Sequence, residues 1–191
     1  MVKILCFGDS NTFGYDPCSP LGERYGAEIR WVDRLAVKLA CECVNAGENG
    51  REIPTREWEK RYFQHLLKTH QPDHAIIMLG SNDLLQGNPV EVVAGQMEQF
   101  LEKSDRKRIL LVAPPPMERG EWVTTQELIS SSVELGRAYK ALSERLGIAF
   151  ADAGAWNIPL AYDGVHFSAE GHRAFAEGLA DYFRNRRKSH A

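Results

Sequence analysis

Four short polar segments carry side chains that a protein core does not require. They contain Ser10, Asn82, the pair Asp163 and His166, and a glycine- and asparagine-rich stretch that ends in Gly50. A serine hydroxyl is a weak nucleophile until a base removes its proton, and a histidine does this well when a carboxylate fixes its tautomer. Ser10, His166 and Asp163 are the residue types that this arrangement needs, and they predict nucleophilic acyl transfer.

Asp163 precedes His166 by three residues, so one turn of chain could place the carboxylate beside the ring. Pairs with this spacing also occur on ordinary protein surfaces. Taken alone, the pair does not distinguish a catalytic site from a solvated turn. It gains meaning from the other three segments.

Acyl transfer also needs hydrogen-bond donors aimed at the oxygen that becomes negative, and each is worth about 2.7–4 kcal/mol in the transition state. The backbone N–H groups of Ser10 and Gly50 and the side-chain amide of Asn82 are candidate donors for this oxyanion hole. Glycine at position 50 lets a substrate oxygen approach the main chain without a Cβ in the way. An ordinary turn glycine is the alternative at that position.

The elements that must position these residues are indicated by apolar runs rich in β-branched side chains. Five such runs alternate with helical periodicities and predict a parallel sheet, because parallel strands are joined by helical crossovers. The carboxyl ends of parallel strands meet at one edge, where ligands bind, and a long irregular stretch follows each run. The predicted strands are Val2–Phe7, a segment around Val44, Ala75–Leu79, Ile109–Ala113 and Ile148–Ala151.

Helices are expected between these strands. Trp31–Leu39 carries one apolar face, and in the next helix Trp58, Tyr62, His65 and Leu66 are expected to form the buried face. Asn88 is a candidate N-cap before Pro89, and Thr124 with Glu127 reads as a capping box. The last helix follows Ser168.

Composition describes one ordinary globular domain over residues 1–191. The chain is 43% hydrophobic and 26% charged, with a formal net charge of −3. Proteins that bind nucleic acid usually carry a basic face, so nucleic acid is not an expected partner. A domain of this size buries about 70% of its unfolded surface and needs no metal or disulfide to be stable.

The first apolar run stops at Asp9, which is too short for a signal-peptide core or a membrane span. The four cysteines lack zinc-site spacing, and Cys6 lies within an apolar run, where its thiol would be a poor nucleophile. These observations lead us to expect a cytoplasmic protein with no metal, no cofactor and no membrane partner.

The four polar segments resemble the blocks of the SGNH hydrolase superfamily, the GDSL-type esterases and lipases. Phe7–Gly14 resembles the nucleophile block, with Asn11 where many members carry leucine. Asn45–Arg51 resembles the glycine block, Leu79–Asp83 the asparagine block, and Asp163–Phe167 the final Asp-x-x-His block. The blocks occur in family order and together cover most of the chain.

This resemblance implies a role for each matching residue and a fold. Ser10 would be the nucleophile, His166 the general base and acid, and Asp163 its orienting partner. The oxyanion hole would consist of the Ser10 and Gly50 N–H groups and the Asn82 amide. The implied fold is a three-layer α/β/α sandwich of flavodoxin-like type with a five-stranded parallel sheet, which agrees with the strand pattern.

The chain departs from many relatives at Glu48–Asn49, which puts the polarity of the site in question. A closer likeness is to the arylesterase and acyltransferase branch. That branch typically takes short acyl esters, some members transfer the acyl group to alcohols, and many are oligomeric. A small-molecule ester and a homo-oligomer are therefore the implied partners. The likeness rests on Phe13–Pro17, Arg30–Trp31, Ile76–Gly80 and Val112–Pro116.

Four further side chains are candidates for the substrate pocket. Phe13 and Tyr15 follow the nucleophile, and Trp156 and Ile158 precede Asp163. Ordinary packing is the alternative for each of them. Trp122 and Trp156 lie in loops that could make contacts between subunits.

The sequence also allows other functions besides an esterase. Ser10, Asn11 and Thr12 could form the phosphate cradle of a flavodoxin-like flavin-binding module, which would explain only one loop. Asp9 could accept a phosphoryl group, but the second acidic residue of such phosphatases is missing. A carbohydrate deacetylase or a thioesterase would use the same triad, and a scaffold kept only for binding would leave the candidate catalytic residues unexplained.

Overall fold

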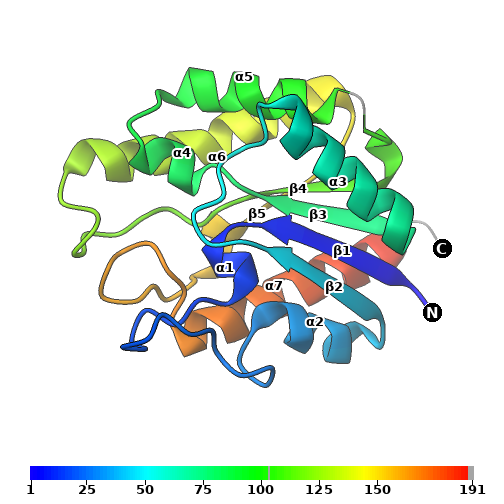
Figure 1. Ribbon diagram of the computed structural model, residues 1–191, viewed down its shortest axis with the longest axis horizontal. Helices are drawn as coiled ribbons and strands as arrows, with labels where there is room; N and C mark the ends of the chain where they lie inside the picture. Colours follow the sequence, from blue (N-terminus) through cyan, green and yellow to red (C-terminus); the bar gives the residue numbers. More distant parts are fainter. Residues whose placement is uncertain (103, 189–191) are drawn as a thin grey trace.

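The computed structural model describes residues 1–102 and 104–188, and its centre is a five-stranded parallel sheet (Figure 1). The strand order is β2-β1-β3-β4-β5, the flavodoxin-like order, which confirms the predicted fold class. The predicted domain, 1–191, includes Lys103 and residues 189–191, which lie outside the described residues. The strands are β1 (Lys3–Gly8), β2 (Glu42–Gly47), β3 (His74–Met78), β4 (Ile109–Ala113) and β5 (Ala149–Asp152).

Helices cover both faces of the sheet and make it the middle of three layers (Figure 1). Helices α2 (Trp31–Leu39) and α7 (Ala169–Lys188) lie on one face, and α3 (Glu57–His70), α5 (Val90–Leu101) and α6 (Gln126–Leu146) lie on the other. Because both faces are covered, the inner strands read as continuous apolar runs. The remaining elements are α1 (Ser10–Phe13), α4 (Ser81–Leu85) and the 3₁₀ turns Arg106–Arg108 and Ala153–Trp156.

Side chains of β1 alternate between the two apolar cores. Leu5 and Phe7 point to the core under α3, α5 and α6, whereas Ile4 and Cys6 point to the core under α2 and α7. All four are at most 1% exposed. This double burial fixes the register of β1, and with it the position of the loop that follows Gly8.

The buried face of α3 differs from the expected one. Phe63 is fully buried against Phe7 and Phe100, with ring centroids 4.8 and 5.0 Å away. Trp58 and Tyr62 are 58% and 45% exposed, and His65 is also exposed. The helix presents a narrow stripe around Phe63 to the core, so the larger aromatic residues beside that stripe face solvent.

Two helix starts are shifted by one residue from their predicted positions. Thr125, not Thr124, caps α6, and its hydroxyl oxygen accepts a hydrogen bond from the N–H of Leu128 at 3.3 Å. Pro89 is itself the N-cap of α5, in place of Asn88. Adjacent threonines offer the same capping oxygen, so local sequence does not decide between them.

Within the described residues, no helix combines the length and the apolar composition needed to cross a membrane.

Candidate active site

Ser10 lies at a sharp turn from β1 into α1. The Asp9 carboxylate caps this short helix by accepting a hydrogen bond from the N–H of Asn11 at 2.9 Å. Gly8 is required at the turn because a Cβ there would lie 2.1 Å from the Thr12 hydroxyl and 2.8 Å from the Met78 carbonyl oxygen. The turn therefore places the Ser10 side chain at the carboxyl edge of the sheet.

The structure brings Ser10, His166 and Asp163 into one hydrogen-bonded row. His166 Nε2 lies 3.0 Å from Ser10 Oγ, and His166 Nδ1 lies 2.7 Å from Asp163 Oδ2. Since an ionised carboxylate only accepts hydrogen bonds, we assign the ring proton to Nδ1, which leaves Nε2 to accept from the serine hydroxyl. The row therefore has the geometry of a nucleophile, its base and the orienting partner of that base.

The Asp163 carboxyl is held in its ionised form. Burial alone would raise its pKa, but hydrogen bonds to its oxygens outweigh burial and lower the pKa below the ordinary value. Oδ1 accepts from the N–H groups of Val165 and His166, both at 2.9 Å, while Oδ2 faces the imidazole. An ionised Asp163 can stabilise the imidazolium that forms when His166 takes a proton from a hydroxyl.

Asn11 forms hydrogen bonds that join the turn carrying Ser10 to the loop carrying His166. Its amide nitrogen donates to the Val165 carbonyl at 3.1 Å, and its amide oxygen accepts from the N–H of Phe167 at 2.8 Å. These two contacts bracket His166 on both sides in the chain. In the sequence, Asn11 stands where many members of the resembled family carry leucine, so this role was missed. A polar side chain directly after Ser10 was the available signal.

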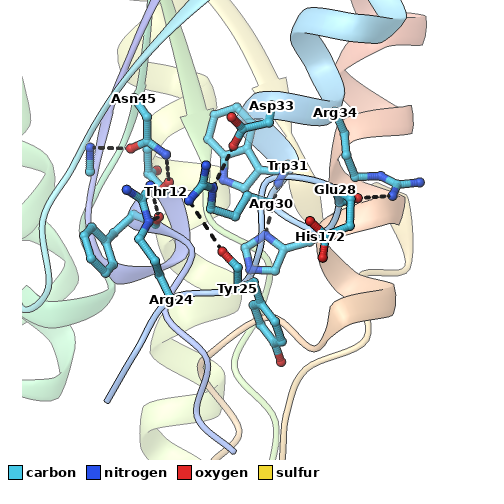
Figure 2. Close-up of polar contacts among 12 residues, drawn as sticks. Thr12, Arg24, Tyr25, Glu28, Arg30, Trp31, Asp33, Arg34, Asn45 and His172 are labelled. Carbon is cyan, nitrogen blue, oxygen red and sulfur yellow. Dashed lines mark hydrogen bonds and ion pairs between the residues drawn. The ribbon is translucent and has the colours of Figure 1, made fainter. Parts of the chain in front are cut away.

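The turn that carries Ser10 is also supported by side chains of β2, of α2 and of the loop between α1 and α2 (Figure 2). The Asn45 amide donates to the Thr12 carbonyl oxygen at 2.8 Å, and the Arg24 guanidinium donates to the Phe13 carbonyl oxygen. The indole N–H of Trp31 donates to the Asn11 carbonyl oxygen at 2.9 Å. The short helix α1 therefore has its carbonyl groups satisfied by three neighbouring segments.

The three candidate oxyanion donors come from the loops after β1, β2 and β3, which are neighbouring strands. Ser10 is the first residue of α1, where helix geometry leaves its N–H without an intrahelical acceptor. Gly50 has φ +73° and open space where a Cβ would stand. Asn82 donates one amide hydrogen to the Arg51 carbonyl oxygen at 2.9 Å, which leaves its second amide hydrogen for a ligand.

Arg51 links the loop after β2 to the end of β1. Its Nη1 donates to the Gly8 carbonyl oxygen at 2.9 Å and to the Ala46 carbonyl oxygen. Its guanidinium lies 4.2 Å from the centroid of the Phe7 ring, and Nη2 pairs with Glu48 at 2.5 Å. The polar Glu48 in the glycine block therefore has a structural partner in Arg51.

Asp83 anchors the far end of the same loop. Its carboxylate oxygens accept from the N–H of Ile53 at 3.2 and 3.3 Å. Burial raises the pKa of Asp83 to about 6, and it also raises the pKa of Asp9 to about 6. Asp9 is thus a buried capping carboxyl, which argues against its use as a phosphoryl acceptor.

Two aromatic rings lie beside the His166 imidazole. The Tyr15 ring centroid is 4.7 Å from that of His166, and the Trp122 ring is 5.0 Å from it in an edge-to-face arrangement. Tyr15 was expected to line the substrate pocket, and the structure places its ring beside His166. Trp122 was expected only as a contact between subunits, and its place beside His166 was missed because its loop is far from His166 in the sequence.

Trp156 and Ile158, which we expected to line the substrate pocket, pack into the core under α7. The Trp156 ring packs edge-to-face on Phe175 of α7 at 5.3 Å and lies over Gly178, and Ile158 is 6% exposed in the same core. The chain leaving β5 folds over α7 before it returns to Asp163, so these side chains fill that core. The contacts of Phe13 also indicate packing, because the Arg24 guanidinium covers its ring at 4.3 Å.

Two other side chains that could be reactive, those of Cys6 and His172, are buried outside the group formed by Ser10, His166 and Asp163. Burial raises the pKa of the Cys6 thiol well above its ordinary value, as expected for a structural cysteine. His172 lies between Tyr25 and Trp31 (Figure 2), and burial lowers the pKa of its imidazole to about 3. In the part of the chain that the structure describes, no group of three or more His, Cys, Asp or Glu side chains is arranged to hold a metal ion.

Comparison with known proteins identifies the family of the chain. Residues 6–174 match the GDSL-like lipase/acylhydrolase family. A solved structure from Agrobacterium tumefaciens str. C58 is 30% identical, with a TM-score of 0.84 over 97% of this chain and 99% of that chain. The aryl esterase of M. smegmatis is 29% identical, with a TM-score of 0.83 over 97% of this chain and 99% of that chain.

Another similar structure is Est24, a carbohydrate acetylesterase from Sinorhizobium meliloti, with 27% identity and a TM-score of 0.82 over 97% of this chain and 99% of that chain. No curated protein matches the chain in sequence. The family match covers far more than half of the chain. The solved structures similar to this chain include esterases. The chain therefore belongs to the GDSL-like lipase/acylhydrolase family, the SGNH-type hydrolases that its four sequence blocks resemble.

Proposed function

We propose that the chain is a serine esterase that hydrolyses carboxylic esters through an acyl-enzyme on Ser10. The observation that carries the proposal is the row of contacts in which His166 lies 3.0 Å from Ser10 Oγ and 2.7 Å from Asp163 Oδ2. A base within hydrogen-bonding reach of a hydroxyl, itself oriented by a carboxylate, is the arrangement that activates a serine.

In acylation, Ser10 Oγ attacks the carbonyl carbon of the ester while His166 Nε2 takes the hydroxyl proton. The carbonyl oxygen becomes an oxyanion, which accepts hydrogen bonds from the N–H groups of Ser10 and Gly50 and from the Asn82 amide. The tetrahedral intermediate then collapses, the bond to the alcohol oxygen breaks, and His166 returns the proton to the departing alcohol. Asp163 stabilises the imidazolium between these steps.

In deacylation, His166 takes a proton from water, and the resulting nucleophile attacks the acyl carbon on Ser10. The carboxylic acid leaves and the proton returns to Ser10. An alcohol that occupies the place of water gives a new ester instead, so acyl transfer needs no additional residue. The partners are small ester and alcohol molecules, and the steps require no cofactor.

Short acyl esters, including aryl esters, are the proposed substrates. Neighbours in structure are named an aryl esterase and a carbohydrate acetylesterase, which supports a small acyl group. Carbohydrate deacetylation and thioester hydrolysis are the alternatives within the same chemistry, because both present a carbonyl carbon to Ser10.

A flavin-binding module is less well supported. The loop after β1 would have to use its polar side chains as a phosphate cradle, but Ser10 faces His166 and Asn11 is bonded to Val165 and Phe167. Two of its three polar side chains are therefore engaged within the protein. The esterase accounts for these contacts and for Asp163 and Asn82.

The test compares the wild type with Ser10→Ala on activated esters of increasing acyl length. We expect Ser10→Ala to lower kcat by at least about 10⁴-fold, because the nucleophile and its base act as a unit. Ser143→Ala is the matched control, since Ser143 is also buried but donates to the Lys140 carbonyl oxygen within α6. Equal activity of Ser10→Ala and wild type would rule out the mechanism.

A further inference from the structure

The position of Trp122 beside His166 is fixed by main-chain contacts between two loops. The N–H groups of Glu118, Glu121 and Trp122 donate to the carbonyl oxygens of Gly164, Tyr162 and Asp163 at 3.0, 3.1 and 3.1 Å. The loop after β4 therefore lies directly along the segment that carries Asp163 and His166. Trp122 is bonded through its own N–H to the residue that orients His166.

Two glycines allow the loops to come this close. A Cβ on Gly120 would lie 2.4 Å from the Asp163 carbonyl carbon, and a Cβ on Gly164 would lie 2.1 Å from the Glu118 carbonyl oxygen. Gly164 also has φ +82°, which disfavours other residues. Main-chain contacts therefore fix the position of Trp122 beside His166, although Trp122 is 52% exposed.

The chemistry of the proposed reaction determines which part of the substrate meets these rings. His166 Nε2 must take the proton of Ser10 and then deliver it to the oxygen of the departing alcohol, so that oxygen comes within hydrogen-bonding distance of Nε2. The body of the alcohol then lies beside the imidazole. Tyr15 and Trp122 have their ring centroids 4.7 and 5.0 Å from that of the imidazole, so both rings offer apolar surface beside it.

We propose that Trp122, together with Tyr15, forms the alcohol subsite of the enzyme and selects esters of planar ring alcohols such as phenols. This inference rests on the proposed esterase function and deepens it. A large aromatic side chain with half its surface in solvent gains contact area when a flat ring packs against it, and paired rings favour offset or edge-to-face geometry. An aliphatic alcohol gains less from the same surface.

The same subsite acts in both half-reactions. The alcohol that leaves during acylation and the alcohol that attacks during acyl transfer occupy the same place beside His166, because the second step is the reverse of the first. Trp122 is therefore expected to favour ring-bearing acceptors over ethanol when the acetyl-enzyme partitions between alcohol and water.

The experiment compares phenyl acetate with ethyl acetate, which form the same acetyl-enzyme and differ only in the alcohol. In Trp122→Ala, the ratio of kcat/KM for the phenyl ester to that for the ethyl ester is expected to fall about tenfold from the wild-type ratio, and Trp122→Phe should restore most of it. In acyl transfer, the preference for benzyl alcohol over ethanol is expected to fall in the same direction.

Val37→Ala is the control, because Val37 is an exposed apolar residue, at 82%, near the C-terminal end of α2. Its ratio is expected to equal that of the wild type. A proportional loss for both esters in Trp122→Ala would show that Trp122 only supports His166 and would overturn the subsite. An unchanged ratio, or a change in oligomeric state without a change in the ratio, would overturn it as well.

The failure of this inference is distinguishable from failure of the proposed function. If Ser10→Ala hydrolyses both esters as fast as the wild type, the acyl-enzyme mechanism fails. If Ser10 is essential and the Trp122→Ala ratio is unchanged, only the alcohol subsite fails.

Discussion

The side-chain amide of Asn82 donates a hydrogen bond to the carbonyl oxygen of Arg51 over 2.9 Å, and this contact joins the loops that follow β3 and β2. Arg51 immediately follows Gly50, so the bond fixes two candidate oxyanion donors relative to each other. The Arg51 side chain then reaches the Gly8 carbonyl oxygen, two residues before Ser10. All three donors are thus connected through one residue that donates none of the oxyanion hydrogen bonds.

Asn82→Ala is expected to lower kcat by about 10²–10³-fold with a small change in KM. An oxyanion donor acts on charge that develops only in the transition state, so its loss affects the chemical step more than ground-state binding. Steady-state kinetics on a short aryl ester measure both constants. Because Asn82 also holds the Arg51 carbonyl, thermal unfolding of the variant must accompany the kinetics, and a folded variant with unchanged kcat would remove Asn82 from the oxyanion hole.

Arg51→Lys tests whether the fork of the guanidinium positions the loop after β2. Lysine keeps the positive charge but cannot reach the Gly8 and Ala46 carbonyl oxygens with the same geometry or lie flat over Phe7. We expect kcat to fall about tenfold or more, because small displacements of reacting groups are costly. Arg145→Lys, which alters an exposed ion pair with Glu98, is the control. Equal kcat values for Arg51→Lys and the control would contradict a positioning role.

The strands and the candidate catalytic residues were predictable for different reasons. A strand covered on both faces must be apolar at every position, as Ile109–Ala113 is, so its sequence identifies it without knowledge of the fold. Ser10, Asp163 and His166 belong to short blocks whose spacing is set by chemistry within a single turn. Both kinds of signal are local.

The positions of Trp156 and Trp122 were not predicted, because they depend on contacts between segments that are distant in the sequence. Trp156 is seven residues before Asp163, but the direction in which the chain leaves β5 carries it to α7. Trp122 reaches His166 only because main-chain bonds join its loop to Tyr162 and Asp163. Periodicity and propensity carry no information about such loop-to-loop pairing.

Gly164→Ala is expected to destabilise the protein and displace the loop that carries Trp122. The added Cβ would overlap the Glu118 carbonyl oxygen, and φ +82° is unfavourable for alanine, so the free energy of unfolding should fall by about 1–3 kcal/mol. Gly95→Ala on α5 is the matched control, because its Cβ would meet open space and alanine favours a helix by about 1 kcal/mol. Urea unfolding of both variants measures the two effects, and a Gly164→Ala protein as stable as the wild type would contradict the close approach of the loops.

His172 is expected to make folding stability depend on pH. Its imidazole is fully buried, Nδ1 accepts from the N–H of Trp31 at 3.4 Å, and Nε2 has no hydrogen-bond partner among the described residues. Burial lowers its pKa from 6.5 to about 3 in the folded protein. Between these two values the unfolded chain binds a proton that the folded chain excludes, so this group destabilises the fold as pH falls below about 6.5.

Asp9 and Asp83 act in the opposite direction. Their pKa values are raised by burial from 3.8 to about 6, so the folded state binds their protons more tightly, and their contribution becomes more favourable as pH falls through 6. The pH profile of the wild type alone therefore does not isolate the effect of His172.

His172→Asn removes the titrating group and keeps a side-chain oxygen that can accept a hydrogen bond from the N–H of Trp31. Between pH 6.5 and 5, we expect the wild type to lose about 1.6 kcal/mol relative to the variant. The slope approaches about 1.36 kcal/mol per pH unit only below pH 6.5, where the unfolded imidazole becomes fully protonated. Urea unfolding at both pH values measures this difference, and parallel pH profiles for the two proteins would show that His172 becomes protonated without unfolding.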